Sequence, residues 1–160
     1  ILFAWGNGRF NDPVPAYFRI NVHRFSFERM LAFEGNTGPY LLNALVRVRS
    51  IFRRAAERGI GVAYRSASLT IAQPAERKLA LALLRYPQTM RAAGAMSEPH
   101  RVCALLYDIA SAYSAFYEHC PVLAAESEAM RDARLRLCDL TGRVLADGLE
   151  TLGMPTLERM

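Results

Sequence analysis

Residues 39–59, PYLLNALVRVRSIFRRAAERG, carry the clearest structural signal in the chain. Pro39 suits the first turn of a helix, where its missing amide hydrogen costs nothing. Apolar residues then recur every three or four positions, which is the period of one face of a helix. Gly59 and Gly61 stop the pattern. The sequence therefore predicts an amphipathic helix over these residues, with an apolar stripe of Leu41, Leu45, Val48, Phe52 and Ala55.

The same period continues to the end of the chain, with breaks near residues 60–73, 86–98 and 120–126. Helices are predicted from Pro74 to Arg85, in a short stretch ending at Met96, from about Pro99 to His119, and over about 126–152. Gly153 supplies the flexible position after the last helix. The expected fold class is all-α, a bundle of four to five helices spanning 29–160. Its further apolar positions are Leu79, Leu83, Val102, Leu105, Ile109, Ala112, Phe116, Met130, Leu137, Val144, Leu145, Leu149 and Leu152.

Residues 1–28 have a different character, with turn-forming glycines and prolines among aromatic and β-branched residues. Ile20, Val22, Phe25 and Phe27 alternate imperfectly, as in an extended segment. We expect loops and short strands there, in a segment separate from the helical domain.

The composition is that of an ordinary globular domain, with 52% hydrophobic and 22% charged residues. The formal net charge of +5 comes almost wholly from arginine, since Lys78 is the only lysine. A GC-rich genome or selection for phosphate binding would each explain that bias. Three cysteines without a metal-ligand spacing indicate a reducing cytosol and no structural zinc. Without an 18-residue apolar run or a signal peptide, the sequence predicts a cytoplasmic protein with no membrane partner.

Catalytic and metal-binding patterns are scarce. The glycines at 35 and 38 are not followed by the Lys-Ser/Thr pair of a P-loop, and the three histidines lie in separate elements. Neither an HExxH pattern nor a Ser-His-Asp arrangement can be assembled from local spacing. We therefore expect no catalytic residue, no metal site and no cofactor in this chain.

The segment FEGNTGPY at 33–40 places two glycines and an Asn-Thr pair directly before the first long helix. Asn36 or Thr37 could cap that helix by accepting hydrogen bonds from its free amides. The same helix start could instead bind a phosphate, because its amides and dipole favour an anion. Both interpretations remain open.

Two groups of residues could contact a nucleic acid. Asn43, Arg47 and Arg54 lie on one face of the first long helix, beside its apolar stripe. They form either a solvated face or a surface for RNA phosphates and bases. Tyr113 and Tyr117, one turn apart near the end of the fourth helix, belong either to the core or to a stacking platform for an unpaired nucleotide.

Several blocks, taken in order, resemble the C-terminal domain of class I arginyl-tRNA synthetases. They are RMLAFEGNTGPYL at 29–41, RVRSIFRR at 47–54, EPH at 98–100, FYEHCPVL at 116–123 and LGMPTLERM at 152–160. The resemblance covers about residues 27–160. It implies a DALR-type helix bundle that binds the anticodon loop of tRNA(Arg) and works with the catalytic domain of the synthetase.

The resemblance also assigns roles to individual residues. Asn43, at a position where the family often has tyrosine, and Arg47 would contact the loop. Tyr117 would support the flipped anticodon bases, and Met160 would lie near the same site. Anticodon reading needs unstacked bases held on aromatic or arginine planes, and both residue types are present.

The HIGH and KMSKS signatures of class I catalytic domains occur nowhere in the 160 residues. Whether the chain is an enzyme by itself is therefore open. ATP and magnesium are implied only for a full-length synthetase, and DNA is not an expected partner. Two alternatives stay open, namely a free-standing tRNA-binding paralogue and a purely structural helical oligomerisation domain.

Overall fold

The structure, a computed structural model, describes residues 37–157. Over this range it contains five α-helices and one short 3₁₀ helix and has no strand, which confirms the predicted all-α bundle. The loops and short strands expected over residues 1–28 lie outside the described range. The elements are α2 (Gly38–Glu57), η1 (Val62–Ser66), α3 (Pro74–Leu84), α4 (Tyr86–Met96), α5 (His100–His119) and α6 (Glu128–Thr151).

Helix α2 begins and ends as its sequence predicts. The Thr37 side chain caps it by accepting a hydrogen bond from the Tyr40 amide, at 3.4 Å. Gly59 follows the helix with a φ of 71°, in the left-handed region that glycine adopts without strain. Phe52 is only half-buried, whereas the neighbouring Ile51 is buried. The buried stripe is therefore centred slightly differently from the predicted one: Leu41, Ala44, Leu45, Val48, Ile51 and Ala55.

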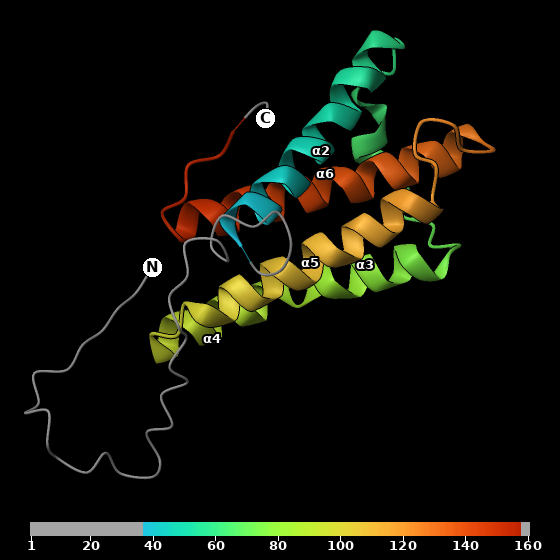
Figure 1. Cartoon of the computed structure of the whole chain (residues 1–160). Coiled ribbons are helices and arrows are strands. Elements are labelled where there is room, and N and C mark those ends of the chain that lie inside the picture. Colours follow the sequence, from blue (N-terminus) through green and yellow to red (C-terminus); the bar gives the residue numbers. More distant parts are fainter. Residues whose placement is uncertain (1–36, 158–160) are drawn as a thin grey trace, which may run out of the picture.

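The helices form two sides around a shared core (Figure 1). Helices α3 and α4 follow one another and pack along α5, while α2 and η1 lie against α6, which also contacts α5 and α3. The predicted apolar stripe of α5 is buried along its whole length. Where α5 crosses α6, Gly148 lets the backbones approach so closely that a Cβ there would lie 2.6 Å from a methyl group of Leu106. The 3₁₀ helix η1 was not predicted, and its Tyr64 packs against Phe52 with ring centroids 5.4 Å apart.

Helices α2 and α5 run in the same direction. Tyr40 in the first turn of α2 packs on Tyr107 of α5, with ring centroids 5.4 Å apart. At the other end, Arg58 donates a hydrogen bond to the Leu123 carbonyl oxygen, at 3.4 Å, just beyond α5. Residues between these two contacts therefore lie at matching levels along the two helices. None of the helices between residues 37 and 157 combines the length and hydropathy of a membrane-spanning segment.

Candidate nucleic-acid interface

The cationic side of this interface comes from α2. Arg47 and Arg54 are exposed, and neither makes an ion pair with another residue between 37 and 157. Asn43 is half-buried one turn before Arg47 on the same face. A helix presents residues three or four positions apart on one side, so these side chains form the polar stripe that the sequence predicts. The structure adds that α2, which carries these side chains, packs beside α5.

The aromatic side comes from the last turns of α5. Tyr117 is 41% exposed, although its ring is large and apolar. Tyr113, one turn earlier, is fully buried, and its ring centroid lies 6.3 Å from that of Tyr117. Tyr113 also contacts the ring of Phe116. Tyr117 is therefore a surface ring resting on a buried aromatic base, while Tyr113 has no open ring face for a nucleotide in this conformation.

The hydroxyl of Tyr113 links the two sides. It is a buried side-chain oxygen with no hydrogen-bond partner among the described residues. Burial raises the pKa of Tyr113, as do Cys138 and Tyr117, whereas the positive charge of Arg47 acts in the opposite direction. Arg47 is thus close enough to Tyr113 to influence its ionisation. Arg47 of α2 and Tyr117 of α5 thus both act on the ionisation of Tyr113.

Met160, which the family resemblance places near this site, lies outside the described residues. The segment before it turns back along α2, starting at Gly153 with a φ of 73°. Arg49 donates hydrogen bonds to the Leu157 carbonyl oxygen and, at 3.3 Å, to the Thr156 hydroxyl. Side chains two positions apart in a helix point to nearly opposite sides. Arg49 therefore holds this segment on the side of α2 away from Arg47, an arrangement that the sequence did not predict.

A buried ion pair was also missed from the sequence. Glu76 of α3 and Arg134 of α6 lie 2.7 Å apart and are almost completely buried. Arg134 donates to the Pro121 carbonyl oxygen at 3.0 Å, and Glu76 accepts from the amides of Ala72 and Gln73 at 2.7 and 2.9 Å. The sequence does contain one indication of this pair, because Arg134 lies at a position of α6 where the apolar stripe would place a hydrophobic residue. This network fastens the segment that follows α5 to α3 and α6 at Pro121, four residues beyond Tyr117.

Burial and hydrogen bonding act on Glu76 in opposite directions. Burial by itself would raise the pKa of this carboxyl group. The Gln73 amide, Arg134 and the Ala72 amide all stabilise the ionised form and together leave the pKa below its ordinary value. Glu76 is therefore a buried carboxylate held by Arg134 and two backbone amides.

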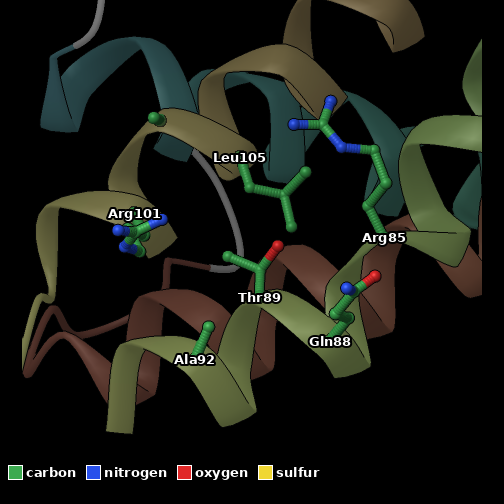
Figure 2. A pocket seen from close by; sticks show the side chains of 7 residues that line it. Arg85, Gln88, Thr89, Ala92, Arg101 and Leu105 are labelled. Carbon is green, nitrogen blue, oxygen red and sulfur yellow. The ribbon is translucent and has the colours of Figure 1, made fainter. Parts of the chain in front are cut away.

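Two hollows lie away from the arginine and tyrosine face. One is between α4 and α5, where Figure 2 shows Arg85 and Arg101 at opposite ends with Thr89 and Leu105 between them. The other lies between α2 and α6. Neither is lined by Arg47 or Tyr117. Tyr117 and Arg47 are instead exposed on the surface, where a strand with unstacked bases could reach them.

The chain has relatives whose matched part has this length and fold. The DALR anticodon binding domain matches residues 41–160, three quarters of the chain. The chain belongs to the DALR anticodon-binding domain family. This membership confirms the resemblance predicted from the sequence blocks and favours the anticodon-binding interpretation over a purely structural bundle.

Named relatives of this DALR domain are arginine–tRNA ligases. The ligase of Stutzerimonas stutzeri is 50% identical over 144 residues, which are 89% of this chain and 24% of that protein. The ligase of Pseudomonas aeruginosa is 47% identical over 142 residues, with the same coverage. The DALR domain thus spans about a quarter of the length of these curated relatives.

Solved structures agree with the sequence relatives. The Plasmodium falciparum arginyl-tRNA synthetase superposes with a TM-score of 0.73 at 33% identity, covering 86% of this chain and 24% of that one. The Thermus thermophilus arginyl-tRNA synthetase gives 0.68 at 35% identity, covering 81% and 22%. The helix bundle described above is therefore the arrangement found within synthetases of this class.

Proposed function

We propose that this DALR domain recognises the anticodon loop of tRNA(Arg) as the C-terminal part of an arginine–tRNA ligase. The observation that carries the proposal is the exposed ring of Tyr117, which lies 6.3 Å from the ring of buried Tyr113. Arg47 on the neighbouring helix α2 is exposed and makes no ion pair among residues 37–157. Unpaired anticodon bases need a flat apolar surface, and their backbone needs positive charge close by. The match to the DALR anticodon binding domain supports anticodon binding by the domain as a whole.

Each side chain has a distinct part in the proposal. Tyr117 stacks on a splayed base, and Tyr113 supports it from inside the core. Arg47 and Arg54 neutralise phosphates along α2, as exposed guanidinium groups do in RNA complexes. Asn43 is placed to form a hydrogen bond with a base or sugar. The family resemblance implies a place for Met160 near the same site, but the proposal gives it no contact, because Arg49 holds residues 156 and 157 on the side of α2 away from Arg47.

The proposal assigns arginine activation to the remainder of the ligase. The HIGH and KMSKS signatures are absent from the 160 residues, so ATP and magnesium would bind in a separate catalytic domain. Among residues 37–157, no three His, Cys, Asp or Glu side chains come together as a metal site. The partners of this chain are then the tRNA loop and that catalytic domain.

The test uses an RNA hairpin with the anticodon stem and loop of tRNA(Arg). Tyr117→Ala should weaken binding by about 1–3 kcal/mol, the usual contribution of one base–aromatic stack. Tyr117→Phe is the matched control, because it keeps the ring and should keep the affinity. Fluorescence anisotropy gives the Kd, and circular dichroism checks folding.

Two results would refute the proposal. In the first, Tyr117→Ala binds the hairpin as tightly as the wild type. In the second, the affinity of the wild type is independent of salt, since phosphate contacts require log K to fall as log salt rises. A flat salt series would favour the alternative of a structural bundle. Loss of folding in Tyr117→Ala would assign the residue to the core.

A further inference from the structure

We infer that the outer side of α3 and α4 is the surface on which the catalytic domain of the synthetase docks. This inference rests on the proposed function, since it requires that such a domain exists. The surface is centred on Leu81 and Leu84 and is called the leucine face below. Nothing in the RNA-binding proposal uses it.

The leucine face is an apolar surface that the bundle itself leaves uncovered. Leu84 is 75% exposed and Leu81 54% exposed, although Leu79 and Leu83 on the inner side of the same helix are buried. Residues three apart on a helix are neighbours, so the two exposed leucines form one patch. Helix α3 does not need them for its own packing, and adjacent exposed apolar residues indicate a contact surface.

The charges around the leucines favour a protein partner. Arg77, Lys78 and Arg91 are exposed on α3 and α4, and none makes an ion pair within residues 37–157. Glu76 is the only carboxylate between residues 74 and 96, and it is buried against Arg134. An apolar centre with a cationic rim is complementary to a protein surface with an apolar centre and carboxylates at its edge. An RNA strand would satisfy the cations but leave the leucines in water.

The leucine face lies level with the start of α2 along the axis of α5. Arg85, the residue after Leu84, pairs with Asp108 of α5 at 3.1 Å. Tyr40, in the first turn of α2, packs on Tyr107, the neighbour of Asp108 in sequence. The leucine face and the start of α2 are therefore level along α5, and Figure 1 shows the start of α2 and helix α4 at the same end of the molecule.

The arginine–tRNA ligases that match this chain are long enough to contain a further domain that could cover the leucine face. The matched part is only 24% of the Stutzerimonas stutzeri ligase, so about three quarters of that protein precedes or surrounds it. A catalytic domain that packs on this end of the bundle would cover the leucine face. The hollow in Figure 2 adjoins this face through Arg85 and Gln88 and offers polar groups for hydrogen bonds to the same partner.

The test compares the 160-residue chain alone with a fusion in which it replaces the matched quarter of the Stutzerimonas stutzeri ligase. Hydroxyl-radical oxidation followed by mass spectrometry reports the solvent exposure of each side chain. Oxidation of Leu81 and Leu84 should fall several-fold in the fusion. Val62, which is 65% exposed on η1, is the matched control and should be oxidised equally in both proteins.

A substitution makes the comparison specific. Leu84→Glu in the fusion should restore the oxidation of Leu81, because a carboxylate cannot enter an apolar interface with an acidic rim. In the chain alone the same substitution should leave hairpin RNA affinity unchanged. Circular dichroism confirms that the variant folds, which is expected because Leu84 is mostly exposed.

The inference is overturned if Leu81 and Leu84 are oxidised equally in the two proteins, or if Val62 is protected as strongly as they are. It is also overturned if the leucines become protected in the chain alone, either as its concentration rises or when hairpin RNA is added. Those results would identify a second copy or RNA as the occupant. Hairpin affinity tests the proposed function separately, so the two failures can be told apart.

Discussion

Arginine has opposite surroundings in two regions of this molecule. At the contact of α3 with α6, Arg134 is buried against Glu76 and the Pro121 carbonyl oxygen. On the face formed by α2 and α5, Arg47 and Arg54 are exposed and make no ion pair within residues 37–157. The first arrangement uses the hydrogen-bonding capacity of the guanidinium group inside the fold. The second leaves it available for a ligand.

The difference shows why arginine content alone does not identify a binding site. A buried cation needs a partner because desolvation is costly, so the folded state depends on the ion pair and hydrogen bonds of Arg134. An exposed cation has no such requirement, and its presence costs the fold little. Substitutions at the two sites should therefore separate stability from binding.

The largest effect is expected at the buried pair. Arg134→Leu leaves Glu76 as a buried carboxylate without its cation, which should lower the free energy of unfolding by about 3–5 kcal/mol. Urea unfolding followed by circular dichroism measures the loss. Arg143→Leu is a suitable control, because Arg143 is mostly exposed and pairs with Asp139 on the surface. A loss below about 1 kcal/mol would show that the pair contributes little.

The same pair should make stability depend on pH. The pKa of Glu76 in the folded state lies below the ordinary value of 4.5, so the unfolded chain takes up its proton first as pH falls. The stabilisation is fully present above about pH 4.5 and is lost as pH falls through the folded-state pKa. Urea unfolding from pH 7 to pH 3 should show a steeper decline for the wild type than for Glu76→Gln. Parallel curves would exclude Glu76 as a source of the acid sensitivity.

Much of the fold could be predicted because its signals are local. The helix boundaries follow from Pro39, Gly59, Pro87, Pro121 and Gly153. The fixed φ of proline and the conformational freedom of glycine act locally, independently of the tertiary structure. All five residues predicted for the apolar stripe of α5 are buried, since the period defines them, but Leu106, Ala110 and Tyr113 are buried beside them and were not in the predicted stripe. The 3₁₀ helix η1 was missed because five residues are too few to show a period.

The site was harder, because it depends on how helices meet. Arg47 and Tyr117 are 70 positions apart in sequence, and they lie on two neighbouring helices, α2 and α5, that run in the same direction. Tyr113 and Tyr117 look equivalent in the sequence, yet one is buried and the other 41% exposed. The role of Arg49 could not be predicted either, since its acceptors lie more than 100 residues away.

A smaller effect is expected at the core beneath the interface. The Tyr113 hydroxyl is buried without a hydrogen-bond partner among the described residues, and such a group costs free energy in the folded state. Tyr113→Phe removes it while keeping the ring, so the free energy of unfolding should rise by about 1 kcal/mol. Chemical denaturation measures the change. A clear loss of stability would mean that the hydroxyl has a partner in solution.

The smallest effect on stability, with the sharpest contrast to Arg134, is expected at Arg54. Arg54→Ala should change the free energy of unfolding by no more than about 0.5 kcal/mol, since the side chain is exposed and alanine favours a helix. Hairpin RNA affinity should fall, and the slope of log K against log salt should become shallower by about one, as expected when one phosphate contact is lost. Arg143→Ala, on the surface of α6, should change neither quantity. If the slope of log K against log salt is unchanged for Arg54→Ala, the RNA phosphates bind elsewhere. If Arg54→Ala lowers the free energy of unfolding as much as Arg134→Leu does, the distinction between structural and ligand-binding arginines is wrong.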